Sequence, residues 1–273
     1  MSAHNENRKQ ITVRSLAEMK QAKQKIACLT AYDASFARLL EDAGVDVVLV
    51  GDSLGMVVQG RETTLPVSVD DMLYHTQCVA SGLQNSLLIT DMPFLSFTSV
   101  EQAVLNAGLL MKQGGAHMVK LEAGVDQADT VSALNKNGIP VCAHLGLQPQ
   151  YVHKIGGYRV QGRDEKAAEK MLADAVTMQQ AGADLMLLEC VPEALAAKIT
   201  AELEIPVIGI GAGAECDGQI LVLYDILGIS MGIKPKFSEN FLRSADSIEA
   251  AISLYVSAVK NGEFPAAKHV FKQ

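Results

Sequence analysis

The sequence predicts a (β/α)8 barrel, a domain in which eight parallel strands alternate with helices and close on themselves. Three observations support this fold class. Short apolar runs alternate with segments of helical spacing, without a break in composition between them. The runs are continuous, as expected for strands that are covered on both faces. The chain has 273 residues, close to the roughly 250 typical of such barrels. A doubly wound open sheet remains the alternative, because strand number alone cannot close a barrel.

The predicted strands are the continuous apolar runs, at 25–33, 45–52, 86–94, 117–124, 139–146, 184–192 and 205–213. The segments between them carry apolar residues three and four positions apart, which is typical of amphipathic helices. These helices are predicted at 35–44, 68–82, 99–115, 128–138, 163–182 and 193–203. With a weaker eighth unit near 219–228, this alternation predicts parallel strand–helix units.

Two segments flank the repeat, and we expect them to complete one domain over 1–273. The segment 12–24 has one apolar face and is predicted to be a helix that plugs one end of the barrel. The segment 246–262 shows helical spacing and is predicted to be a C-terminal helix. The tail after it carries Phe264 and Phe271, so it is either frayed or docked on a neighbouring chain.

Composition excludes several classes of protein. The net charge of −8 argues against a nucleic-acid binder, which would normally show a basic patch. It remains compatible with a small anionic substrate, because local charges can override the global balance. Five cysteines without a CxxC spacing indicate a reduced, cytoplasmic protein without a disulfide framework or structural zinc. The polar N-terminus shows no signal peptide, and no apolar run approaches the roughly 18 residues of a membrane span.

Five consecutive predicted strands end in an acid or a histidine: Asp52, Asp91, Glu122, His144 and Glu189. The carboxyl ends of barrel strands meet at one rim, where the active sites of such barrels lie. A single acid in this place is commonly a helix cap or a solvated side chain, whereas five in succession indicate a site. Because converging carboxylates repel, we expect a divalent cation between them. Oxygen ligands without Cys or clustered His favour Mg²⁺ over Zn²⁺.

Lys120 lies on the same strand face as Glu122, since side chains alternate along a strand. A buried lysine needs a partner. It pairs with a neighbouring carboxylate or binds an anionic group of the substrate, and the sequence leaves both readings open.

Two glycine-rich segments are weaker signals. "GIGAGA" at 209–214 lacks the first-unit position of a dinucleotide fingerprint, and it indicates close backbone packing or a phosphate cup. "GGYRVQGR" at 156–163 is either a mobile lid or a surface turn.

Many short motifs, in order along nearly the whole chain, resemble those of the ketopantoate hydroxymethyltransferase family. They are "LTAYDASFA", "LVGDSLGMVVQG", "TLPVSVDDMLYHT", "MVKLE", "HLGLQPQ", "GGYRVQGR", "LLECVP" and "PVIGIGAG" followed by "CDGQILV". The resemblance implies a TIM barrel that transfers the one-carbon unit of 5,10-methylenetetrahydrofolate to 3-methyl-2-oxobutanoate. The product, 2-dehydropantoate, leads to pantothenate and coenzyme A. The resemblance also implies a homo-oligomer, typically a decamer.

The resemblance also implies a role for each motif residue. Asp52, Asp91 and Glu122 match a Mg²⁺ site. The positions that match contacts to the keto acid, or lie close to it, are Asp52, Ser53, Asp91, Lys120 and His144. Glu189 matches the proton acceptor. In this scheme Mg²⁺ stabilises the enolate formed when the C3 proton is lost. Gly51 and Gly55 then leave room for the backbone to approach a ligand.

Three rival interpretations stay open at this point. Barrels of the phosphoenolpyruvate mutase and isocitrate lyase kind also place acids around Mg²⁺, but they usually carry a Lys-Lys-Cys-Gly-His loop, which this sequence lacks. A phosphosugar or amino-acid biosynthetic barrel would use "GIGAG" as a phosphate cup and would leave the acids unexplained. A non-catalytic assembly protein would not need the acid rim at all.

Overall fold

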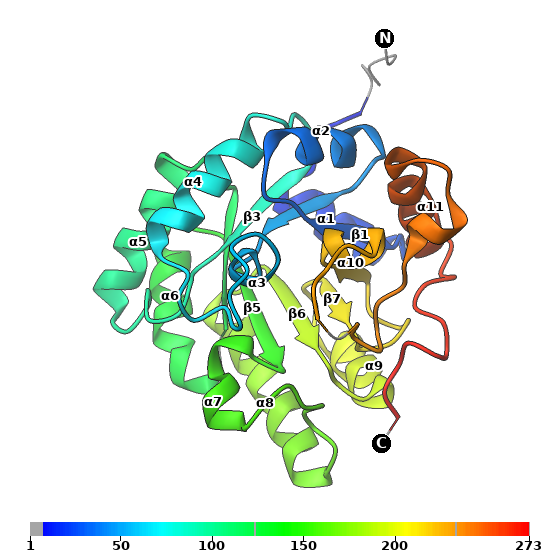
Figure 1. Cartoon of the computed structure of the whole chain (residues 1–273). Coiled ribbons are helices and arrows are strands. Elements are labelled where there is room, and N and C mark those ends of the chain that lie inside the picture. The colour runs from blue at the N-terminus through cyan, green and yellow to red at the C-terminus, as the bar shows by residue number, and fades with distance from the viewer. Residues whose placement is uncertain (1–7, 123, 233, 273) are drawn as a thin grey trace.

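The computed structural model describes residues 8–122, 124–232 and 234–272, and its core is a closed barrel of eight parallel strands in sequence order (Figure 1). The strands are β1 Ile26–Thr30, β2 Val47–Val50, β3 Leu87–Asp91, β4 Met118–Glu122, β5 Val141–Gly146, β6 Leu185–Glu189, β7 Val207–Ile210 and β8 Gly218–Leu221. The sheet closes where β1 pairs with β8, with Cys28 opposite Ile220. The predicted fold class is therefore confirmed, and the open sheet is excluded.

Helices surround the barrel and connect successive strands (Figure 1). The longer ones are α2 Ala34–Asp42, α4 Val69–Ala80, α5 Val100–Lys112, α6 Ala128–Lys136, α8 Glu165–Ala181 and α9 Glu193–Glu202. Shorter ones are α3 Leu54–Val57, α7 Val152–Ile155, α10 Leu223–Leu227, and the 3-10 turns η1 Val125–Gln127, η2 Pro149–Tyr151 and η3 Phe241–Ser244. In the described part of the chain, none of the helices is long and apolar enough to cross a membrane.

The strands are buried along their length, which explains why they appear in the sequence as continuous apolar runs. All residues of β1, β2, β3 and β4 are buried. The predicted runs, except 139–146, extend beyond the strands at their carboxyl ends. The run 25–33, for example, ends in Asp33, whose side chain accepts a hydrogen bond from Phe36 N and caps α2. These overhanging residues form the loops at the barrel mouth.

The N-terminal helix α1, Val13–Gln21, lies at the barrel end opposite the mouth, as predicted for a plug. Leu16 is the buried residue of this helix. Lys20 Nζ lies 2.7 Å from Asp217 Oδ2 and donates to Thr200 O at 2.9 Å. Because Asp217 directly precedes β8, this ion pair fixes α1 against the amino ends of the strands.

The C-terminal helix α11, Ile248–Lys260, and the tail pack on the barrel of the same chain. Tyr255 Oη donates to Cys28 O at 2.8 Å and to Gln219 O at 3.0 Å, which joins α11 to β1 and β8. Phe264 is buried, with its ring edge-on to that of Tyr255. The alternative that the tail is frayed was wrong, because Phe264 packs against Phe241 and Tyr255 of the same chain. That the tail also docks on a neighbouring chain stays a prediction.

Candidate active site

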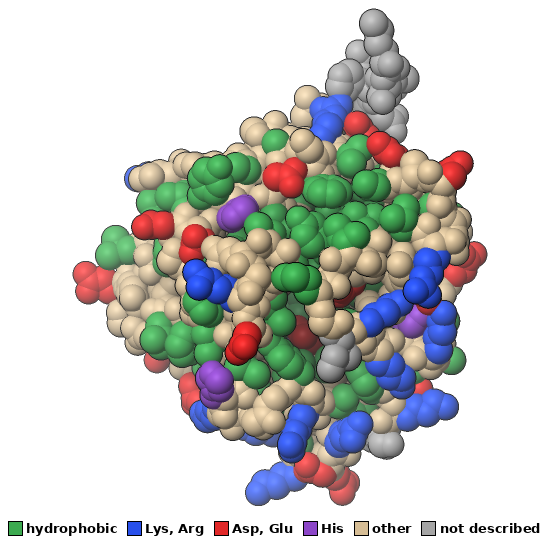
Figure 2. Space-filling view, viewed as in Figure 1, with side chains coloured by type: hydrophobic (Ala, Val, Ile, Leu, Met, Phe, Trp, Pro, Cys, Tyr) green, Lys and Arg blue, Asp and Glu red, His purple; other side chains and the backbone are tan. Residues whose placement is uncertain are grey.

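A cavity of about 940 Å³ opens at the carboxyl ends of the strands. Every rim residue predicted from the sequence lines it, namely Asp52, Ser53, Asp91, Lys120, Glu122, His144 and Glu189. Figure 2 shows this hollow near the centre of the face, with acidic atoms at its floor and hydrophobic side chains around them. The closed barrel thus brings together side chains that are distant in sequence.

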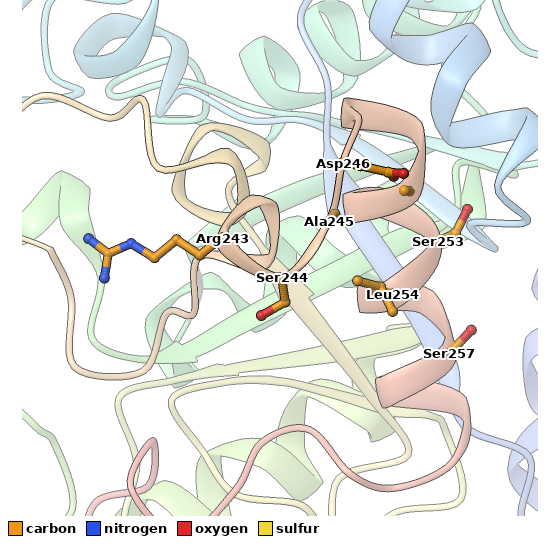
Figure 3. A pocket seen from close by; sticks show the side chains of 8 residues that line it. Arg243, Ser244, Ala245, Asp246, Ser253, Leu254 and Ser257 are labelled. Atoms are coloured by element: carbon orange, nitrogen blue, oxygen red, sulfur yellow. The ribbon is translucent and has the colours of Figure 1, made fainter.

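A second hollow lies on the outer surface, between η3 and α11, and holds no comparable cluster (Figure 3). Its lining is Arg243, Ser244, Ala245, Asp246, Ala250, Ser253, Leu254 and Ser257. Arg243 extends away from Asp246 in Figure 3, so the two charges do not converge on a ligand. The chemistry therefore belongs to the barrel mouth.

Asp52 and Asp91 form the centre of the acid cluster. Asp91 is the last residue of β3, and its Oδ2 accepts a hydrogen bond from the backbone N of Asp52 at 2.9 Å. Burial and the Asp91 charge raise the pKa of Asp52 to about 7, while Lys120 and a hydrogen bond from Gln150 oppose the rise. Asp52 therefore changes its charge near neutral pH.

Lys120 compensates part of this negative charge. It faces Asp91 in the register of β3 and β4, with its Nζ 2.8 Å from Asp91 Oδ1. Burial alone would lower its pKa, but Asp91, Asp52 and Glu122 together raise it above the usual range. The reading that Lys120 pairs with a carboxylate is confirmed. Its contact with substrate stays a prediction.

Glu189 and His144 face each other on the other side of the cavity. Burial raises the pKa of Glu189 to about 7, although Lys120 opposes the rise. About 15% of the Glu189 side chain remains exposed, which leaves its carboxylate open to the cavity. Burial and the Lys120 charge hold the pKa of His144 well below its usual range. A neutral imidazole next to an acid that titrates near neutrality is suited to proton transfer.

The backbone turns sharply directly after Glu189. Cys190 adopts a φ of 49°, in the left-handed region that non-glycine residues rarely occupy. Its N donates to Ile210 O at 2.9 Å, and its carbonyl accepts from Gln161 N at 3.0 Å. Such strain persists only where the surroundings impose it. Here it fixes the strand end that carries Glu189.

The second of these hydrogen bonds fastens the segment 156–163 to the site. Tyr158, Arg159 and Val160 line the cavity, and Tyr158 Oη donates to the sulfur of Met56 at 3.7 Å. The segment is therefore part of the mouth, with Tyr158 and Arg159 exposed at the surface. Its mobility stays a prediction.

Gln150, which the sequence reasoning missed, connects two of the acids. Its backbone N donates to Glu122 Oε2 at 3.0 Å, and its Nε2 donates to Asp52 Oδ2 at 2.8 Å. Its Oε1 is buried and has no hydrogen-bond partner among the described residues. The residue lies in the "HLGLQPQ" motif, but nothing in its spacing points to an acid 98 positions away.

Tyr32 is a second residue that was missed. Its hydroxyl lies 2.9 Å from Ser53 Oγ, at the beginning of α3. His75 Nδ1 donates to the Tyr32 carbonyl at 2.7 Å and so holds the loop from α4. Burial raises the pKa of Tyr32, which keeps its hydroxyl protonated. Tyr32 therefore orients Ser53.

The glycines act mainly through close packing. A Cβ on Gly51 would lie 2.8 Å from Ser53 Oγ, inside the site; that Gly51 leaves room for a ligand stays a prediction. A Cβ on Gly55 would instead lie 2.6 Å from Val67 Cγ2, so Gly55 makes room for the chain and not for a ligand. In "GIGAGA", Gly211 has a φ of +62° and packs against Phe237. Close packing therefore explains this motif, and the phosphate cup does not.

The acids offer the oxygen ligands that Mg²⁺ prefers, but not yet a common coordination sphere. In the described ranges, no three acidic, His or Cys side chains converge within reach of one metal ion. Asp91 is paired with Lys120, and Asp52 and Glu122 with Gln150. Because Mg²⁺ usually takes one or two carboxylates and completes its sphere with water and substrate, the buried acids fit such an ion.

The chain is similar to known proteins over nearly its whole length. A family model described as ketopantoate hydroxymethyltransferase matches residues 10–267. A protein of Alkalilimnicola ehrlichii is 58% identical over 97% of this chain and 96% of its own length. One of Tolumonas auensis is 58% identical over 96% of this chain and 98% of its own. Both are named 3-methyl-2-oxobutanoate hydroxymethyltransferase.

Solved structures share the fold at much lower identity. A phosphoenolpyruvate phosphomutase from Streptomyces platensis subsp. rosaceus superposes with a TM-score of 0.61 at 15% identity, over 80% of this chain and 83% of that one. A phosphonopyruvate hydrolase in complex with oxalate and Mg²⁺ gives 0.59 at 13% identity, over 94% and 92%. At such low identity, these similarities show that the proteins share the barrel fold, and they carry no information about the substrate.

Proposed function

Because the chain belongs to the ketopantoate hydroxymethyltransferase family, we propose that it transfers a hydroxymethyl group to 3-methyl-2-oxobutanoate and so makes 2-dehydropantoate for pantothenate synthesis. The protein is an enzyme of the transferase class. We further propose that 5,10-methylenetetrahydrofolate is the donor and Mg²⁺ the cofactor.

The observation that carries this proposal is the placement of charge in one cavity. Glu189 lies on the β6 side, with a pKa near 7. The Asp91–Lys120 pair lies on the β3–β4 side. Removal of a proton next to a carbonyl needs a base near neutrality and positive charge for the oxygen that becomes negative. This cavity contains both.

The keto acid is held by its carboxylate and keto oxygens. Lys120 supplies a fixed positive charge, and Ser53, oriented by Tyr32, supplies a hydrogen-bond donor. Asp52, Asp91 and Glu122 would hold Mg²⁺. When bound, the ion acts as a Lewis acid that polarises the keto group. These residues orient the substrate so that its C3 proton faces Glu189.

Glu189 then takes the C3 proton as a carboxylate, and the electron pair of the C–H bond forms the enolate. The enolate carbon attacks the methylene carbon of the folate donor, which forms the new C–C bond and breaks one of the two C–N bonds, and the nitrogen that leaves takes the electron pair and the proton held by Glu189. Water then replaces the second folate nitrogen at this carbon and supplies the hydroxyl group, and that nitrogen leaves with the electron pair of its C–N bond and takes the proton that water loses. The neutral His144 lies beside Glu189, with its Nε2 3.3 Å from Glu189 Oε2, and leaves the base function to the carboxylate.

The test is exchange of the C3 proton of 3-methyl-2-oxobutanoate for deuterium, followed by NMR with Mg²⁺ and protein. We expect exchange well above a metal-only control. A wild-type protein that exchanges no faster than this control, with or without folate, would contradict the function.

We also propose that the chain assembles into a homo-oligomer, in line with the family resemblance. Tyr74 on α4 and Leu105 on α5 leave 64% and 66% of their surface exposed, and a partner subunit would cover them if it docked on these helices. Sedimentation equilibrium gives the subunit number. A monomeric protein at micromolar concentration would contradict the assembly, and a decamer would agree with it.

A further inference from the structure

The carboxylate of Glu189 is held differently from those of two other rim acids. Gln150 donates hydrogen bonds to the carboxylates of Asp52 and Glu122, from its side chain and its backbone respectively. In the described ranges, the Glu189 carboxylate accepts no such bond, and His144 Nε2 faces it at 3.3 Å without a hydrogen bond. A general base must leave its oxygens open to the proton that it takes. The position of Glu189 therefore has to come from its backbone.

The backbone of Glu189 is fixed on the side of β5. Glu189 faces Gly146 in the register of β5 and β6, and its carbonyl accepts a hydrogen bond from Leu147 N at 2.8 Å. A Cβ on Gly146 would lie 2.2 Å from that carbonyl oxygen and 2.8 Å from Val191 Cγ2. Gly146 also has a φ of +93°, which residues with a side chain rarely adopt. Only glycine therefore lets the end of β5 approach Glu189 this closely.

On the other side the backbone is fixed through Cys190. Its N donates to Ile210 O at the end of β7, and its carbonyl accepts from Gln161 N in the segment 156–163. Between these two hydrogen bonds, the φ of 49° lies in the left-handed region. An unbranched side chain is uncommon in this region, and a β-branched one is a genuine outlier there. The turn therefore depends on a residue at position 190 that keeps a positive φ.

We propose that Gly146 and Cys190 are positioning residues, whose backbone conformations hold Glu189 where it can take the C3 proton of the keto acid. The inference rests on the proposed function, because it takes Glu189 as the base. Both residues act on the rate of proton removal, since a displacement of about 1 Å at a reacting group can cost about 100-fold. Substrate binding depends on them little, because Ser53 and Lys120, which hold the keto acid in the proposed function, lie on other strand ends.

The main test is a matched pair of variants at one position, Cys190→Ser and Cys190→Thr, which differ by a single methyl group on Cβ. Serine keeps the positive φ at a cost similar to that of cysteine, whereas the branched threonine opposes it. The assay is C3 proton exchange, which needs no folate. We expect Cys190→Thr to lower kcat about ten- to hundred-fold, with KM for the keto acid close to that of wild type, because an interaction with the transition state alone is lost. Cys190→Ser should exchange at nearly the wild-type rate. Wild-type kcat in Cys190→Thr would overturn the proposal.

The control carries the same backbone strain away from the site. Lys23 lies in the turn between α1 and β1, is exposed and has a φ of 54°. Lys23→Thr should lower the melting temperature, as Cys190→Thr does, because both changes force a branched residue into the left-handed region. Its kcat for exchange should equal that of wild type. If Lys23→Thr loses as much exchange as Cys190→Thr, lost stability alone slows the reaction, and the positioning role is overturned.

A second variant, Gln161→Pro, carries the test if Cys190→Thr does not fold. Proline has no backbone N–H, so this variant removes the hydrogen bond to the Cys190 carbonyl from a segment outside the helices and strands. Because a hydrogen bond contributes about 0.5–1.5 kcal/mol, kcat for exchange should fall about three- to ten-fold, with KM close to that of wild type. Gln161→Ala keeps the N–H and should restore exchange. A Gln161→Pro variant with wild-type kcat would contradict the role of this turn.

The outcomes separate this inference from the proposed function. If wild type exchanges the C3 proton and Cys190→Thr exchanges equally fast, the positioning role is lost and the function stays. If wild type exchanges no faster than the metal-only control, the proposed function fails, and the positioning role fails with it. If wild type and Cys190→Ser exchange while Cys190→Thr loses kcat alone, both are supported.

Discussion

Glu189 Oε2 lies 3.3 Å from His144 Nε2, across the neighbouring strands β6 and β5. The other ring nitrogen, Nδ1, lies 3.3 Å from Lys120 Nζ. Because an ammonium group has only donors, Nδ1 accepts, and this assigns the ring proton to Nε2, facing the carboxylate. A neutral imidazole therefore lies between the Glu189 carboxylate and the Lys120 ammonium group.

The Glu189→Gln variant should lose C3 proton exchange by at least about a hundred-fold, since general bases contribute about 10²–10⁴-fold. It should keep its affinity for Mg²⁺ and the keto acid, because the amide of glutamine has nearly the same shape as the carboxylate. NMR measures the exchange rate, and calorimetry measures the binding of Mg²⁺ and the keto acid. Glu202→Gln, an exposed change on α9, is the control. Normal exchange in Glu189→Gln would remove this residue from the base role.

The exchange rate should rise with pH through about 7. Burial raises the pKa of Glu189 to about that value, and only the carboxylate can accept the C3 proton. Below this pKa the group is protonated and inactive, and above it the rate should reach a plateau. The measurement is kcat/KM for exchange between pH 5 and 9, with Mg²⁺ saturating. A rate that is flat across neutrality argues against a base of this pKa.

Asp91→Asn should lower Mg²⁺ affinity by more than about a hundred-fold, because even the partners of metal ligands cost about 10–100-fold when lost. Loss of the Asp91 charge also leaves Lys120 without the carboxylate with which it forms an ion pair. The variant should therefore melt at a lower temperature, since breaking a buried pair costs about 3–5 kcal/mol. Calorimetry of Mg²⁺ binding below the melting range is the measurement, with Asp246→Asn as the control. Unchanged Mg²⁺ binding would contradict the ligand assignment.

Gln150→Leu should move the pH dependence of Mg²⁺ binding to higher pH. The Gln150 amide donates to Asp52 Oδ2 and lowers the pKa of that carboxyl. Without this donor, Asp52 holds its proton to higher pH, and Mg²⁺ must compete with the proton. Mg²⁺ titrations at a series of pH values test this. The control is Gln77→Leu, on the exposed face of α4, which should show the wild-type pH midpoint of Mg²⁺ binding. If Gln150→Leu also shows the wild-type midpoint, Gln150 does not lower the pKa of Asp52.

Tyr32→Phe should raise KM for the keto acid by about three-fold, with little change in kcat. The Tyr32 hydroxyl lies 2.9 Å from Ser53 Oγ, and a neutral hydrogen bond contributes about 0.5–1.5 kcal/mol. Tyr74→Phe, at an exposed position on α4, should leave KM unchanged. A Tyr32→Phe enzyme with wild-type KM would show that Ser53 needs no such orientation.

Much of the fold was predictable from local pattern. The strands appeared as continuous apolar runs because a closed parallel barrel buries both strand faces. Helix α3 was missed, since four residues are too few to show helical periodicity. The packing of the tail could not be predicted, because apolar residues near a terminus do not show which surface they pack on. Its partners, Phe241 and Tyr255, lie on other elements.

The sequence by itself determined the members of the acid rim. Strand ends can be read locally, and parallel strands in a barrel present their carboxyl ends to one side. Only the tertiary structure decided how these members interact. Gln150 donates a hydrogen bond to Asp52, which is 98 positions away in the sequence, and Lys120 forms its ion pair with Asp91. Such contacts depend on strand register and barrel closure, which position side chains to within ångströms, whereas sequence spacing specifies only order along the chain.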